Sequence, residues 1–104
     1  MIEAKFLKTL TKQGVKVLDP NSTTIDKTCK IGENVVIFPN NTILGETNIG
    51  KNCILENSNF IENCKIGENN KISFSYLKNS TIKANNQIGP YSRLREAEIE
   101  NNTK

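Results

Sequence analysis

The chain has 104 residues, of which 24% are charged, and its formal net charge is +3. This length suits a single domain. Lysine and glutamate are interspersed without a basic block and aromatic residues make up only 6%, so we do not expect a nucleic-acid partner. No apolar run is long enough to span a bilayer, and no signal peptide opens the chain, so we expect no membrane partner either.

Residues 1–14 predict a short amphipathic helix, which forms the first of two predicted segments. Four apolar side chains lie on one helical stripe, namely Ile2, Phe6, Leu7 and Leu10. Gly14 then follows as a C-terminal cap. Two interpretations stay open: the helix covers the first turn of the next segment, or it connects to an upstream domain. Residues 15–18 predict a short strand that stops at Asp19-Pro20, because proline cannot donate to a ladder.

A branched aliphatic residue recurs from there at steps of six, with some steps of five further on. The positions are Ile25, Ile31, Ile37, Ile43, Ile49, Leu55, Ile61, Ile66, Ile72, Leu77, Ile82, Ile88 and Leu94. Two residues before each lies a small side chain, in the order Thr23, Cys29, Val35, Asn41, Thr47, Cys53, Asn59, Cys64, Asn70, Ser75, Ser80, Asn86 and Ser92. A helix would need a step near 3.6, so the period excludes a helix.

Residues two apart on a strand point to the same side, so both registers point inward and the residues between them point outward. Six residues make one short strand and a corner, and three such units close a triangular coil. The corners carry suitable residues, since Gly32 and Gly50 directly follow an aliphatic, Asn34 lies three residues after one, and Pro39 lies two after one. The sequence therefore predicts an all-β fold, a parallel β-helix of about four coils over residues 15–104. The alternative, an asparagine-rich disordered chain, does not explain two registers in phase.

The three cysteines, Cys29, Cys53 and Cys64, all fall in the small inward register. We expect them to be buried thiols rather than disulfides, as in a reduced cytoplasm. The chain has no histidine and no Cys-x-x-Cys pattern, so it gives no support for a metal site.

Three stretches resemble a known family: residues 14–20 (GVKVLDP), residues 38–50 (FPNNTILGETNIG) and residues 88–95 (IGPYSRLR). They are similar to the bacterial bifunctional N-acetylglucosamine-1-phosphate uridyltransferase/glucosamine-1-phosphate N-acetyltransferases. The similarity covers the linker helix and first coils of the acetyltransferase domain, within the hexapeptide-repeat acyltransferases. The five-residue steps also fall where that family has them.

The resemblance implies a left-handed β-helix, a parallel homotrimer, and active sites between neighbouring subunits. It implies an acyltransferase that uses acetyl-CoA, joined to a magnesium-dependent nucleotidyltransferase domain, in UDP-N-acetylglucosamine synthesis for the cell wall. The chain holds no residues for these cofactors, so acetyl-CoA and magnesium are implied only for a complete family enzyme. Outward aliphatic residues also favour a trimer, because Val36, Leu44 and Ile54 exceed what one narrow prism can bury.

Arg95 matches the family arginine that contacts the sugar phosphate. An arginine suits this role because its planar fork donates two parallel hydrogen bonds. The family's Arg-Pro-Gly here reads Arg95-Glu96-Ala97. We expect this departure to remove a turn and to place a carboxylate beside the phosphate contact. Alternatively, Arg95 is an ordinary solvated surface side chain. We interpret Arg93 as a surface residue.

We expect no catalytic residue in this chain, because the family's base is a histidine in later coils. Glu46, Glu56 and Glu62 are the carboxylates that could accept a proton, but their positions suit outward strand or corner residues. The chain alone is therefore expected to be inactive, and the β-helix to be incomplete at its C-terminal end.

Two function classes remain open. In the first, the chain is a fragment or shortened relative of the sugar-nucleotide enzyme, a trimerising scaffold with at most a partial sugar-phosphate site. In the second, it is a stand-alone structural or interaction module that pairs with a longer homologue. An ice-binding β-helix would need flat ranks of outward threonine, and the outward residues here are mostly lysine, glutamate and asparagine.

Overall fold

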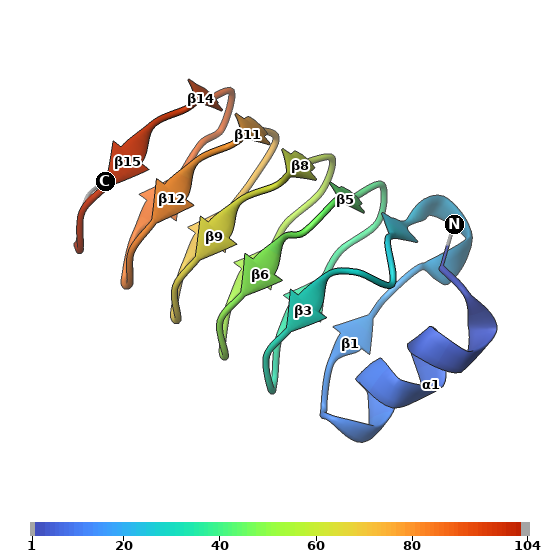
Figure 1. The fold of residues 1–104 in the computed structure, drawn as a ribbon. Helices are drawn as coiled ribbons and strands as arrows, with labels where there is room; N and C mark the ends of the chain where they lie inside the picture. Colours follow the sequence, from blue (N-terminus) through green and yellow to red (C-terminus); the bar gives the residue numbers. More distant parts are fainter. Residues whose placement is uncertain (1, 103–104) are drawn as a thin grey trace.

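The computed structural model describes residues 2–102, in which one helix is followed by a stack of β-coils (Figure 1). Met1 and residues 103–104, which belong to the two predicted segments, lie outside the described residues. Helix α1 spans Ala4–Lys12 and a 3-10 turn spans Pro20–Ser22. The strands are β1 (Lys16–Val17), β2 (Thr24–Ile25), β3 (Lys30–Ile31), β4 (Val36–Ile37), β5 (Thr42–Leu44), β6 (Asn48–Ile49), β7 (Ile54–Leu55), β8 (Phe60–Glu62), β9 (Lys65–Ile66), β10 (Lys71–Ile72), β11 (Tyr76–Lys78), β12 (Thr81–Ile82), β13 (Gln87–Ile88), β14 (Arg93–Arg95) and β15 (Glu98–Ile99).

The strands form three parallel sheets, because each strand pairs with the strand three positions later. We name them by their first strand: the β1 sheet (β1-β4-β7-β10-β13), the β2 sheet (β2-β5-β8-β11-β14) and the β3 sheet (β3-β6-β9-β12-β15). This arrangement confirms the predicted left-handed parallel β-helix. The described residues extend over 34 × 20 × 20 Å.

The number of coils is five rather than the predicted four, since each sheet holds five strands. The additional coil begins at β1, which the sequence identified as a strand but not as part of the repeat. Val17 in β1 pairs with Ile37 in β4 and so lies twenty residues from its partner. The 3-10 turn at Pro20–Ser22 interrupts the step of six here, which hides the first coil from a periodicity search.

Both inward registers are confirmed by burial. Every aliphatic of the first register from Ile25 to Ile88 is at most 7% exposed. Every residue of the second register from Thr23 to Asn86 is at most 6% exposed. Leu94 in the last coil packs against the same core but is only half-buried. The interior is therefore one continuous column of aliphatic side chains flanked by small ones.

Many residues of the small inward register are polar, although the narrow interior requires only that they be small. The side-chain amide of Asn59 donates to the backbone oxygens of Glu56 (2.8 Å) and Ile72 (3.0 Å), and to the side-chain oxygen of Asn41 (3.0 Å). The side-chain oxygen of Asn59 accepts from the backbone N–H of Ser75 at 2.9 Å. In the described residues, no buried side-chain nitrogen or oxygen lacks a partner. These side chains satisfy corner backbone groups that face the interior, which unpaired would be costly.

The corners adopt the left-handed backbone that the asparagines predict. Asn34, Asn52 and Asn69 have φ of 59°, 61° and 60°. In a five-residue unit the left-handed residue lies two rather than three positions after the aliphatic, as at Asn63 after Ile61. A short unit thus loses one corner residue and keeps its strand.

The register of the sheets follows directly from these unit lengths. Thr42 pairs with Phe60, eighteen residues later, across three six-residue units. Phe60 pairs with Tyr76, only sixteen residues later, because two of the three units between them are short. Both inward registers stay in phase across this change.

Glycine allows the coils to approach closely at the start of one corner. A β-carbon on Gly50 would lie 2.7 Å from the backbone nitrogen of Glu68 and 2.7 Å from the carbonyl carbon of Gly67. Gly32 meets the next coil in the same way. A larger residue at either position would push neighbouring coils apart.

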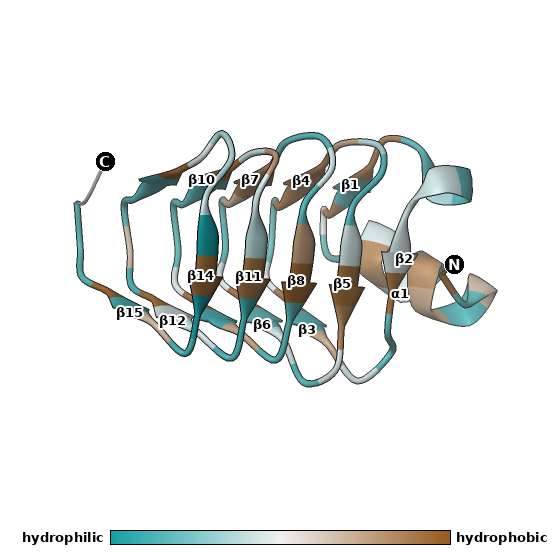
Figure 2. Cartoon of the chain, turned by 90° about the horizontal axis from the view of Figure 1, so that it is seen from above, coloured by the Kyte–Doolittle hydropathy of each residue, from teal (hydrophilic) through white to brown (hydrophobic). Residues whose placement is uncertain are grey.

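Helix α1 packs against the first coil, with Leu10 only 1% exposed (Figures 1 and 2). Gly14 has φ of 84° and donates to Thr11, while Val15 donates to Leu10, a Schellman cap as predicted. Ile2 was wrongly assigned to the helical stripe: it precedes the helix and forms a parallel bridge with Ile25. The helix thus covers the first coil, and a connection to an upstream domain stays a prediction. Nowhere in residues 2–102 is a helix long and apolar enough to cross a membrane.

Cys29, Cys53 and Cys64 are free and buried, as expected. Burial is the largest cause of the raised pKa of each thiol, and it outweighs hydrogen bonds that act in the opposite direction. These thiols therefore stay protonated and act as small apolar side chains that donate weakly, for example from Cys53 to the backbone oxygen of Gly67 at 3.0 Å.

We predict that Cys53→Phe destabilises the chain by about 1–3 kcal/mol or more, because it overpacks an inward slot. Lys65→Phe is the control, since Lys65 points outward from β9 in the β3 sheet and is exposed. Urea unfolding measures both variants. An unchanged midpoint for Cys53→Phe would contradict the inward assignment.

We also predict that stability falls as the pH rises above about 9, the ordinary thiol pKa, because the unfolded chain releases protons that the native chain retains. The control replaces all three cysteines by alanine, which is small and apolar and does not titrate. Urea unfolding at pH 8 and pH 10 should show the larger loss in the unmodified chain. Equal losses of stability in the two chains would show that the thiols do not contribute to the pH dependence of stability.

Candidate functional site

Arg95 lies on the outer side of β14, at the end of the β2 sheet furthest from α1 (Figure 2). Arg93 is two residues earlier on the same strand, so both side chains point to the same side. Lys78 of β11 is the register partner of Arg95. The guanidinium of Arg93 lies 5.7 Å from the ring centroid of Tyr76, within cation–π range. Three cations thus share one surface.

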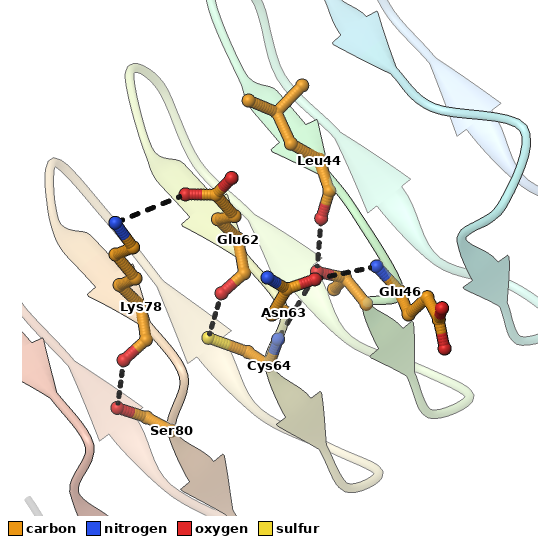
Figure 3. A network of polar contacts seen from close by, with 8 residues as sticks. Leu44, Glu46, Glu62, Asn63, Cys64, Lys78 and Ser80 are labelled. Atoms are coloured by element: carbon orange, nitrogen blue, oxygen red, sulfur yellow. Dashed lines mark hydrogen bonds and ion pairs between the residues drawn. The ribbon is translucent and has the colours of Figure 1, made fainter.

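Arg93 and Arg95 differ from Lys78 in their ion pairing. Lys78 forms an ion pair with Glu62 at 3.8 Å (Figure 3). Arg93 and Arg95 form no ion pair with any residue in the described range 2–102. The two arginines are therefore the positive charges that this face offers to an anion.

The departure from Arg-Pro-Gly does not remove the turn, contrary to expectation. Glu96 takes the left-handed conformation at φ of 51°, and its backbone N–H donates to the carbonyl oxygen of Lys78 at 2.9 Å. The stacking of coils fixes the corner, even with a residue that tolerates this φ poorly. The Glu96 side chain is exposed and directly follows Arg95, so a carboxylate does stand beside it in sequence.

The three candidate proton acceptors do not come together. Glu46 is exposed at the corner after β5, where its backbone N–H donates to the side-chain oxygen of Asn63 (Figure 3). Glu56 follows β7 in the β1 sheet and pairs with Lys71 at 3.6 Å. Glu62 lies in the β2 sheet, paired with Lys78. Within the described residues, no group of three or more His, Cys, Asp or Glu could hold a metal ion.

An open groove along one edge of the β2 sheet escaped the sequence analysis. Its volume is about 480 Å³, and its lining comprises Asn40, Thr42, Ser58, Asn59, Phe60, Phe74, Ser75, Tyr76, Tyr91 and Ser92. Phe60 and Tyr76 stack on the sheet, with centroids 5.1 Å apart and planes inclined by 8°. Phe74 and Tyr91 meet at the neighbouring corner, with centroids 6.2 Å apart. An alignment of the outward and corner positions coil by coil would have revealed both pairs.

The outward aliphatic residues do not form one surface. Val36 and Ile54 are register partners in the β1 sheet, whereas Leu44 belongs to β5 in the β2 sheet. Leu18, which is 52% exposed, and Phe38 lie beside the first pair, because Leu18 donates to Ile37 just before Phe38. We call Leu18, Val36, Phe38 and Ile54 the apolar patch.

Comparison with known proteins places this geometry in context. The chain is 43% identical over 84 residues to the bifunctional protein GlmU of Synechococcus elongatus, covering 81% of the chain and 19% of that relative. It is 38% identical over 98 residues to the bifunctional protein GlmU of Thermotoga maritima, covering 94% and 22%. For the GlmU protein of Clostridioides difficile the identity is 36% over 92 residues, covering 88% and 20%. The chain thus spans about a fifth of the length of these relatives.

A family profile described as the GMPPB C-terminal domain matches residues 14–103. This range contains all fifteen strands found in the described residues and both inward registers. Sequence similarity and coil geometry therefore agree, and the chain belongs to the family described as the GMPPB C-terminal domain.

Proposed function

We propose that the chain acts as a trimerising β-helix scaffold in a GlmU-related acyltransferase. The observation that carries this proposal is the similarity to GlmU proteins over most of the chain. The five-coil β-helix with an N-terminal helix supports it. Transferase activity in UDP-N-acetylglucosamine synthesis, a nucleotidyltransferase partner domain and a cytoplasmic location belong to the same proposal.

The apolar patch is the part of the surface that we assign to trimer contacts. It lies on one flat sheet face of the first coils, and its members protrude outward from β4, β7 and the residues that follow β1 and β4. Burial of such a patch between subunits is favourable at roughly 25 cal/mol per Å² of apolar surface. A β-helix face offers the straight surface that a parallel trimer needs.

Arg95 supplies one contact to a sugar phosphate in this proposal. Its guanidinium is exposed, unpaired with the described residues and free to donate two hydrogen bonds to phosphate oxygens. The chain has no histidine, and its candidate carboxylates are separated or paired with lysines. We therefore propose that this chain alone does not catalyse acetyl transfer and holds at most part of the site.

We predict that sedimentation equilibrium of the chain gives the mass of three subunits. Ile54→Glu should dissociate the trimer, because it places a carboxylate in the apolar patch. Asn48→Glu, on the exposed outer side of β6, is the control and should remain trimeric. A stable monomer at high concentration would contradict the trimer. It would favour the alternative that the chain is a stand-alone module, and a pull-down with a longer homologue would then test that alternative.

We also predict that glucosamine 1-phosphate shifts the amide resonances around β14 in an NMR titration, with weak affinity. Arg95→Gln should weaken binding about tenfold, since hydrogen bonds to charged groups contribute about 1.5–3 kcal/mol. Lys65→Gln on the β3 sheet should leave it unchanged. Equal affinities of the Arg95 variant and the parent chain would remove the phosphate role from Arg95.

A further inference from the structure

The groove on the β2 sheet has two aromatic walls. Phe60 and Tyr76 form one wall from neighbouring strands, and Phe74 and Tyr91 form the other from neighbouring corners. Asn59, Ser75 and Ser92 lie between the walls, but their side chains belong to the inward register, so the groove bottom is mainly backbone that is bonded between the coils. The groove therefore presents two aromatic walls above a backbone floor, and concave sites lined by aromatic side chains are typical of small-molecule binding.

The corner wall carries bulky aromatic residues where most of the other left-handed corner positions carry asparagine. Phe74 and Tyr91 have φ of 47° and 67°, whereas the preceding residues of the same corner column are Asn40 and Ser58. A bulky side chain is disfavoured in the left-handed region, and such strain persists where the surroundings impose it or a function uses it. Tyr91 is also 84% exposed, so core packing does not explain its ring.

The charge of the groove is positive at one end. No carboxylate lines it. Arg93 lies over the Tyr76 ring and has no ion pair with the described residues, while Glu62 on β8, two strands away, forms an ion pair with Lys78. A ligand at this end would meet an aromatic wall and an unpaired guanidinium.

We propose that this groove binds a small planar aromatic anion. The flat ring would lie between the Phe60–Tyr76 and Phe74–Tyr91 walls, and the negative group would face Arg93. The ligand needs both an aromatic ring and a negative group, because the aromatic side chains of the groove carry no charge and Arg93 is a single exposed cation. This site does not use Arg95 and is independent of the sugar-phosphate proposal.

The experiment is an NMR titration of the isotope-labelled chain with three probes. Naphthalene-2-sulfonate has ring and charge, 2-naphthol has the ring alone, and methanesulfonate has the charge alone. Naphthalene-2-sulfonate should shift the amides of Ser75, Ser92 and their neighbours, with at least tenfold higher affinity than either other probe.

Two variants locate the site without disturbing the fold. Tyr91→Asn places at this corner the residue that Asn40 already provides in the same column, so the thermal unfolding midpoint should not fall, yet binding should weaken about tenfold, as for loss of one stacking contact. Arg93→Gln should weaken binding by a similar factor, whereas Lys65→Gln, on another sheet, should not change it.

Three results would overturn the proposal. The first is the absence of shifts in groove amides at millimolar naphthalene-2-sulfonate. The second is equal affinity for the three probes, which would indicate non-specific adsorption. The third is unchanged binding by the stable Tyr91→Asn variant, which would exclude the corner wall.

Discussion

The narrow interior of the prism is the constraint on which the rest of the structure depends. Three sides meet so closely that each side admits one branched aliphatic and one small residue. Because neither slot can be enlarged without separating the coils, the chain must return to the same two registers in every unit. Unit length is free to vary between five and six, since the missing residue comes from a corner and the inward pair is kept.

The same constraint explains why so many buried residues are polar. A corner turns backbone carbonyls toward the interior, and water has no room there. Asn41 and Asn59 fill the small slot and donate to these carbonyls, and Asn59 also donates to the side-chain oxygen of Asn41 along the axis. The core therefore combines a column of apolar side chains with a column of hydrogen-bonded side chains. The inward asparagines of neighbouring coils are linked by these hydrogen bonds.

Much of the fold could be predicted because its signal is periodic. Ile25 to Ile88 and their small partners are spaced by geometry, and the corner asparagines mark positions of left-handed backbone. Features outside the period were harder to place. The strand at residues 15–18 was predicted, but the 3-10 turn hid its place in the first coil, and Ile2 pairs as a bridge although its spacing suits a helix.

The candidate site was harder to predict for a physical reason. The position of Arg95 in the repeat indicates that its side chain points outward, and the structure confirms this. The repeat does not indicate which residues of the neighbouring coil lie beside Arg95. The aromatic groove joins residues sixteen or seventeen positions apart, and their proximity depends on the coil length. It becomes visible only once the register is known, as with Phe60 and Tyr76.

The measurement that tests this account most directly is the set of backbone proton NOEs between neighbouring coils. The account predicts that Thr42 pairs with Phe60, and that Phe60 pairs with Tyr76, where two short units reduce the coil to sixteen residues. NOEs from Phe60 to Lys78 instead of Tyr76 would show a constant coil of eighteen residues. That result would contradict the claim that the inward registers, rather than a fixed coil length, determine how this chain folds.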